Sequence, residues 1–107
     1  MEMRKAMKTE IYDCNLILLE ANDEVKFFDG DNILLVGKVE CCFGALGITT
    51  NDTINWDAIY DMAKRESTTP CFLYNDNFIS FWEIAWNLNY QSDNYFANVE
   101  KIIDKIY

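Results

Sequence analysis

The sequence predicts an α+β domain: a small antiparallel sheet of four to five strands (two hairpins) packed against two helices, the last one C-terminal. Three observations carry this prediction. Asp29-Gly30 lies between two apolar runs, which is typical of a tight hairpin turn. Residues 54–66 carry acids early and bases late, an order that suits the helix dipole. Near the end of the chain, apolar residues recur at helical spacing: Phe96, Val99, Ile103 and Ile106.

Residues 11–19 are apolar and partly β-branched, which predicts a strand, although "NLILLEA" could also begin a helix. Residues 25–28 and 33–36 form the two arms of the first hairpin. The second arm is expected to continue to residue 43, with Gly37 marking a bulge or a close contact.

Residues 49–53 offer several N-cap candidates for the helix predicted over 54–66. Its apolar stripe consists of Ile54, Ala58, Ile59 and Met62. Trp56 is then expected on the flank of the helix, where it could be an exposed anchor.

Residues 71–74 and the run from residue 78 are separated by Asn-Asp-Asn, which predicts a second hairpin. Apolar and polar positions alternate over residues 78–90, which favours a strand with Trp82 and Trp86 on its buried face. A rival interpretation stays open, because Ser80 and Glu83 have capping-box spacing and could start a short helix.

The last element is predicted as a helix over residues 93–107, capped by Ser92 or Asp93.

With 107 residues the chain is long enough for one hydrophobic core, so we expect a single domain over residues 1–107. Residues 1–8 are a basic N-terminal extension that can be disordered. The longest apolar runs are far shorter than the roughly 20 residues of a membrane span, and the basic start is not followed by the apolar core of a signal peptide. We therefore expect a cytoplasmic protein.

Charge is the strongest compositional signal. The chain has 9 basic and 18 acidic residues, a net charge of −9, and residues 66–100 contain five acids and no Lys or Arg. Such a field repels nucleic acid and anionic membranes and steers the protein toward basic protein surfaces. The plainer explanation is that the acidic residues only keep the protein soluble.

The absence of histidine removes the usual nucleophile–base pairs and the commonest metal ligand. Four cysteines are present, but none are spaced as CxxC, so buried reduced thiols are expected instead of a metal or disulfide role: Cys14, Cys41, Cys42 and Cys71. The glycines match no phosphate-binding or dinucleotide fingerprint. The sequence therefore predicts no enzyme, no cofactor and no metal.

These observations suggest a small acidic inhibitor that binds and blocks a basic nucleic-acid-handling protein. Phage anti-defence proteins, such as anti-CRISPR and anti-restriction proteins, and the immunity partners or antitoxins of nuclease toxins are of this class. Direct binding to nucleic acid or membrane is not expected. The predicted partner-binding residues are Asp13, Glu20, Asp23, Glu24, Asp29, Asp31, Trp56, Asp57 and Asp61.

Two alternatives remain at this stage. One is a structural or oligomerising module that uses the strand of residues 78–90 or the helix of residues 93–107 as a homodimer seam. The other is a small enzyme that works with carboxylates or with Cys71.

Overall fold

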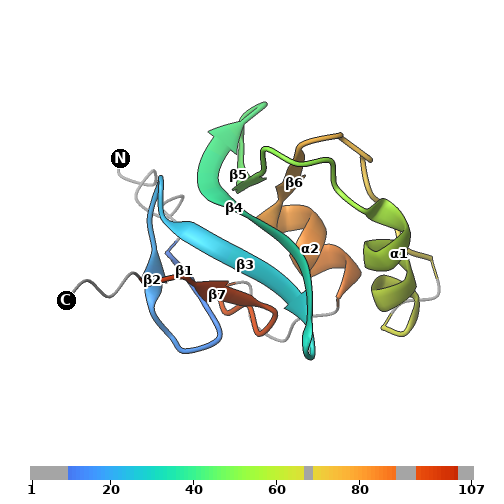
Figure 1. Ribbon diagram of the computed structural model, residues 1–107, viewed down its shortest axis with the longest axis horizontal. Coiled ribbons are helices and arrows are strands. Elements are labelled where there is room, and N and C mark those ends of the chain that lie inside the picture. Colours follow the sequence, from blue (N-terminus) through green and yellow to red (C-terminus); the bar gives the residue numbers. More distant parts are fainter. Residues whose placement is uncertain (1–9, 67–68, 89–93, 104–107) are drawn as a thin grey trace, which may run out of the picture.

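A computed structural model describes residues 10–66, 69–88 and 94–103, and it confirms an α+β fold. A five-stranded antiparallel sheet has the strand order β6-β5-β4-β3-β7, and β1 and β2 form a separate two-stranded sheet (Figure 1). The elements are β1 (Ile11–Tyr12), β2 (Leu18–Leu19), β3 (Glu24–Asp29), β4 (Asn32–Cys42), β5 (Ala45–Thr49), α1 (Trp56–Lys64), β6 (Phe78–Ser80), α2 (Phe81–Asn87) and β7 (Val99–Lys101).

The first hairpin, β3–β4, lies where the sequence predicts it. Asp29 pairs with Asn32 across a two-residue turn, and Gly30 has a φ of +63°, a conformation that glycine adopts without steric cost. Gly37 marks a close contact, as expected, because a Cβ added there would lie 2.0 Å from the carbonyl oxygen of Thr49 on β5.

The second hairpin is not the predicted one. It joins β4 to β5 through Phe43 and Gly44, whose φ angles of 53° and 77° are those of a type I′ turn. The prediction of a strand over residues 71–74 is wrong, because the backbone there bonds to side chains of α2 instead of to a neighbouring strand. The N–H and C=O of Cys71 bond to the amide of Asn87, and the N–H of Leu73 donates to Glu83.

The predicted strand over residues 78–90 is correct only for its first three residues. The chain turns into α2 at Phe81 because Ser80 and Glu83 form a complete capping box. The Glu83 N–H donates to Ser80 Oγ, and the Ser80 N–H donates back to Glu83 Oε1, each over 3.0 Å. Residues 89 and 90 lie outside the described part of the chain.

The helix predicted over residues 93–107 is also wrong for the residues that the structure describes there. Val99–Lys101 forms the edge strand β7, which pairs with β3. Phe96 and Val99 are buried, as the apolar spacing suggested, but Phe96 lies before a turn at residues 97–98 and Val99 begins β7. Backbone bonds such as Phe28 N–H to Asn98 O hold this segment on β3. The second helix of the fold is therefore α2 and not a C-terminal one. Residues 93 and 104–107, like residues 1–8, lie outside the described part.

Residues 11–19 form two short strands, β1 and β2, instead of one. The chain reverses between them because the Asp13 carboxylate accepts hydrogen bonds from the backbone of Asn15 and Ile17.

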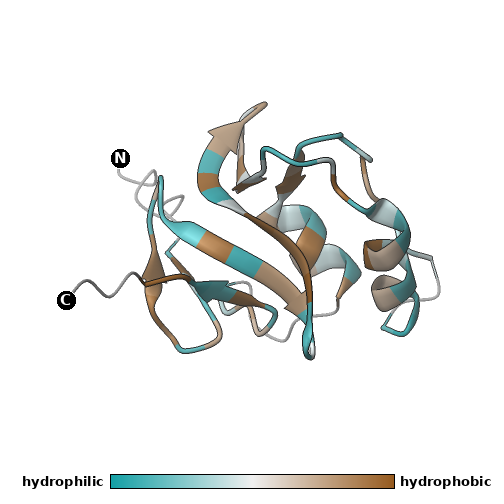
Figure 2. Cartoon of the chain, in the orientation of Figure 1, coloured by the Kyte–Doolittle hydropathy of each residue, from teal (hydrophilic) through white to brown (hydrophobic). Residues whose placement is uncertain are grey.

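The core lies on one face of the main sheet. Hydrophobic and hydrophilic residues alternate along β3 (Figure 2), so that Val25 and Phe27 are fully buried while Lys26 faces the other way. The helices complete this core with Ile59, Met62 and Ala63 from α1 and with Phe81 and Ile84 from α2.

Helix α1 begins after its N-cap Asn55, whose side chain accepts the N–H of Ala58. Within the described residues, no helix is both long and apolar enough to cross a membrane.

Candidate functional site

The most unusual feature of the surface is a pair of stacked tryptophans on α2. Trp82 and Trp86 are one helical turn apart, their ring centroids are 5.5 Å apart and their planes are inclined by 17°. Their relative exposures are 62% and 66%, so the prediction that they belong to the core is wrong. The cause is that these residues form a helix, whose period of 3.6 residues places Phe81 and Ile84 inward and both indoles outward. In the predicted strand, successive side chains would instead have pointed to opposite faces of the sheet.

Two further hydrophobic side chains extend this surface. Phe43, in the β4–β5 turn, and Leu73, in the segment before β6, are 85% and 81% exposed. Together with Trp82 they line a hollow of about 250 Å³. We call these four residues the aromatic face: Phe43, Leu73, Trp82 and Trp86. Exposed apolar groups that gather in this way, unlike scattered single ones, mark interaction sites.

Glu83 lies at the base of the hollow and is only 2% exposed. Its Oε1 accepts the N–H and the hydroxyl of Ser80, and its Oε2 accepts the Leu73 N–H over 2.7 Å. Within the described residues no Lys or Arg pairs with it, so backbone donors and the start of α2 stabilise the charge. The same bonds fix the position of Leu73 beside Trp82.

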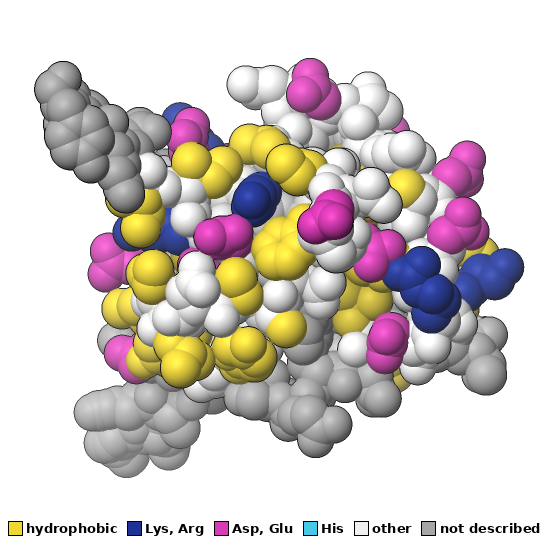
Figure 3. All heavy atoms as spheres, turned by 60° about the horizontal axis from the view of Figure 1, so that its bottom comes forward, with side chains coloured by type: hydrophobic (Ala, Val, Ile, Leu, Met, Phe, Trp, Pro, Cys, Tyr) yellow, Lys and Arg dark blue, Asp and Glu magenta, His cyan; other side chains and the backbone are white. Residues whose placement is uncertain are grey.

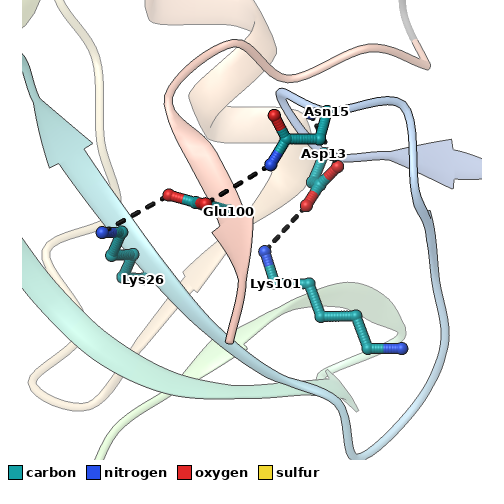
Figure 4. Close-up of polar contacts among 5 residues, drawn as sticks. All are labelled: Asp13, Asn15, Lys26, Glu100 and Lys101. Carbon is teal, nitrogen blue, oxygen red and sulfur yellow. Dashed lines mark hydrogen bonds and ion pairs between the residues drawn. The ribbon is translucent and has the colours of Figure 1, made fainter. Parts of the chain in front are cut away.

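Of the predicted partner-binding residues, Asp13 cannot touch a partner, because its side chain is fully buried. It accepts three backbone N–H groups, from Asn15, Ile17 and Lys101, over 2.8 to 2.9 Å. Figure 4 shows the carboxylate pointing at the backbone of Lys101 while the lysine side chain extends away. Asp13 thus ties the β1–β2 loop to β7.

Figure 4 also shows Glu100 between two partners from different segments. Its carboxylate pairs with Lys26 Nζ at 3.3 Å and accepts from Asn15 Nδ2. The sequence did not reveal these contacts, because Lys26 and Glu100 are distant in the chain, as are Asp13 and Lys101.

Two other predicted acids are also engaged within the fold. Asp23 accepts the Glu20 N–H and lies 3.4 Å from Lys101 Nζ. Asp29 pairs with Arg65 at the end of α1, and this bond raises the pKa of the arginine above its ordinary value. These two carboxylates are partly neutralised, which leaves less charge for steering.

The remaining predicted acids are exposed, but they do not converge at one place. Asp31, Asp57 and Asp61 belong to the β3–β4 turn and to α1, which the Asp29–Arg65 pair holds together. Glu20 and Glu24 lie at the opposite end of β3, about 17 Å away for a strand of this length. On the face that Figure 3 shows, acidic side chains are scattered among hydrophobic ones instead of forming one patch.

Glu24 is brought close to two acids that the sequence analysis did not single out. It lines a polar hollow of about 470 Å³ on the open face of the sheet, with Glu40, Asp52 and one lysine, Lys38. This hollow adds to the negative field but offers few apolar contacts.

Trp56 is held within the fold and is only partly exposed. Its indole N–H donates to the carbonyl of Asn75 over 2.8 Å, and its ring packs against Phe72 and Tyr74, with 5.3 Å between centroids in each case. Trp56 therefore positions the segment that carries Leu73.

All four cysteines are free, but the expectation that they are buried is wrong: Cys41 and Cys71 are exposed and the other two are intermediate. Partial burial, with Glu100 and Asp13 nearby, raises the pKa of Cys14. Among the described residues, no group of three or more Cys, Asp or Glu side chains could hold a metal ion.

Sequence reasoning thus missed the aromatic face, although one signal could have found it. The Ser80–Glu83 capping box implies a helix, and a helix puts Trp82 and Trp86 on the same side, away from Phe81 and Ile84. No local pattern pointed to Phe43 or Leu73, because their clustering depends on the tertiary fold. In comparisons with known proteins, the chain matches no family model, no curated protein and no solved structure.

Proposed function

We propose that the protein is a small inhibitor that docks its aromatic face on a basic, nucleic-acid-handling protein and blocks that protein by occlusion, without catalysis. The single observation that supports this most is the stacked, exposed Trp82–Trp86 pair. Tryptophan is among the residues that contribute most to binding energy at protein interfaces, and its exposure to water is unfavourable until a partner covers it.

The charge distribution supports a basic partner. The stretch of residues 66–100 that carries three of the four residues of the aromatic face contains no Lys or Arg, and the chain as a whole has a net charge of −9. A positively charged surface is attracted by this field, and the surfaces that handle nucleic acids are positively charged because they meet phosphates. An acidic protein on such a surface competes directly with the nucleic acid.

The exposed acids contribute in a different way from the tryptophans. Asp31, Asp57 and Asp61 lie near one end of β3 and Glu24 lies at the other end, so these acids steer the encounter over a distance and form no single contact patch. Affinity then comes mainly from the aromatic face, and association rate from the charges.

The alternative is an oligomerising module, but the structure gives less support to the two homodimer interfaces that the sequence suggested for it. The helical seam of residues 93–107 is absent from the described residues 94–103, and the two edges of the sheet, β6 and β7, are strands of three residues each. A second copy could still cover the aromatic face, although two chains of net charge −9 repel each other.

The proposal is tested by affinity capture from cells that produce the protein, with Trp82→Ala/Trp86→Ala as the variant and Ile33→Ala as the matched control. Ile33 is an exposed hydrophobic residue in β4, outside the aromatic face. We expect wild type and control to retain the same basic protein and to inhibit its nucleic-acid-dependent activity at a one-to-one ratio. The double tryptophan variant should bind at least about 30-fold more weakly. Equal capture by the double variant would show that the aromatic face is not the contact.

A further inference from the structure

The hollow beside Trp82 has a composition that selects among side chains. Its walls are apolar and mostly aromatic, formed by Phe43, Leu73, Phe78 and Trp82, and its base contains the polar groups of Ser80 and Glu83. A ligand that fills it must therefore present an apolar stem or flat surface to the walls and a polar group to the base.

Glu83 makes the base of the hollow negative. Its carboxylate accepts three hydrogen bonds from Ser80 and Leu73, and a carboxylate can accept about four. An anion would be repelled there. A purely apolar side chain would fill the hollow without supplying a donor for the acceptor position that remains on the carboxylate.

The backbone that carries two of the walls is held within the fold before any ligand arrives. Leu73 is fixed by its N–H bond to Glu83, and the next residue, Tyr74, has a φ of 55°. On the other side Phe43 has a φ of 53° in the two-residue turn between β4 and β5. Bulky residues seldom adopt this left-handed conformation, and here it occurs on both sides of one hollow. The hollow is thus preorganised, which lowers the cost of binding.

We propose that this hollow binds an arginine side chain of the partner, an inference that rests on the proposed function and names the group that the aromatic face recognises. A guanidinium group stacks on aromatic rings through its flat face and donates hydrogen bonds through its edge. It also supplies a positive charge for the Glu83 carboxylate, which pairs with no Lys or Arg among the described residues. Its aliphatic stem fits the apolar rim formed by Phe43 and Leu73. No Lys or Arg is among the described residues that line the hollow, so the protein places no cation of its own there.

The test is a titration of the isotope-labelled protein, followed by NMR, with the capped peptide Gly-Arg-Gly-Arg-Gly. The matched ligand replaces both arginines by citrulline, which has a similar shape but no charge. We expect the arginine peptide to shift the indole N–H signal of Trp82 and to leave the backbone N–H signal of Ile33, in β4 and outside the hollow, unchanged. The citrulline peptide should bind at least about tenfold more weakly.

The variant Phe43→Ala/Leu73→Ala removes two walls, and both side chains are so exposed that folding should be unaffected. It should weaken binding of the arginine peptide about tenfold, while Ile33→Ala should leave it within about twofold. Equal binding of the two peptides, or equal binding by the wall variant, would overturn the arginine site.

The two proposals fail separately. If the captured protein depends on Trp82 and Trp86 but the arginine peptide does not bind in the hollow, only the arginine site is wrong. If capture does not depend on the tryptophans, the proposed function is wrong whatever the peptide does.

Discussion

Trp82 and Trp86 stack with their rings nearly parallel on the solvent side of α2, with 5.5 Å between the ring centroids. Each ring shields part of the other, so the pair presents one broad hydrophobic surface in place of two separate ones. The residues on the opposite side of the same helix, Phe81 and Ile84, are buried in the core. Substitutions on the outer side should therefore separate binding from folding, which is the basis of the experiments on this face.

Phe43→Asn should stabilise the fold. Phe43 has a φ of 53° at the first position of a type I′ turn, where Asn is preferred and where other L-residues are strained by about 1 kcal/mol or more. We expect the free energy of unfolding to rise by about 0.5–1 kcal/mol, which is a few degrees in Tm for a domain of this size. Thermal unfolding monitored by circular dichroism measures this.

The same variant should bind its partner less well, because Phe43 is a wall of the hollow. A gain in stability with a loss of affinity would show that the strained residue is there for binding. An unchanged or lower Tm would contradict this account of the turn.

Asp13→Ala should destabilise the protein strongly. The carboxylate is fully buried and accepts three backbone N–H groups, which the substitution leaves without acceptors. Hydrogen bonds to a buried charged group contribute about 1.5–3 kcal/mol each, so a loss of at least about 3 kcal/mol is expected. Urea unfolding gives the value, and Asp31→Ala is the control because Asp31 is exposed. Similar effects of the two substitutions would mean that Asp13 does not anchor the β1–β2 loop.

The cysteines should differ in reactivity. Burial and the neighbouring Glu100 and Asp13 carboxylates raise the pKa of Cys14, so its thiol stays protonated to a higher pH than an ordinary one. At about pH 8.5, alkylation by iodoacetamide should modify the exposed Cys41 and Cys71 first, as mass spectrometry of the peptides can show. The difference should vanish in concentrated urea. Modification of Cys14 at the fastest rate in the folded protein would contradict this prediction.

The exposed acids should govern association more than dissociation. Replacing Glu24, Asp31, Asp57 and Asp61 by Asn or Gln removes four negative charges that lie at the surface. We expect the association rate with the captured partner to fall about tenfold at low salt and its salt dependence to flatten, with little change in the dissociation rate. Biolayer interferometry at several salt concentrations separates the two rates. An unchanged association rate would make the charge of −9 a matter of solubility alone.

The sequence predicted those parts of the fold that local signals determine. Asp29-Gly30 located the first hairpin, and the acid-to-base order located α1. Where two sequence patterns predicted different structures, the pattern that extends over more residues gave the wrong prediction. Alternation over residues 78–90 outweighed the Ser80–Glu83 capping box, yet two reciprocal hydrogen bonds at Ser80 start a helix.

The other errors arose from tertiary contacts. Spacing of Phe96, Val99, Ile103 and Ile106 fits a helix, but β3 has a free edge, and pairing with it makes Val99–Lys101 a strand. The candidate site was likewise hard to predict where it depends on tertiary contacts. Charge could be counted from the sequence, but the roles of Asp13 inside the fold and of Phe43 and Leu73 beside Trp82 depend on segments that meet only after folding.

The central claim is that the aromatic face, and not the open face of the sheet, contacts a partner. Site-specific photo-crosslinking in the producing cells tests it most directly, with benzoylphenylalanine placed at Trp86 and, as a comparison, at the exposed Val36 on β4. We predict that position 86 crosslinks to a basic nucleic-acid-handling protein and that position 36 does not. Crosslinks from position 36 alone, or from position 86 only to a second copy of this chain, would contradict the account.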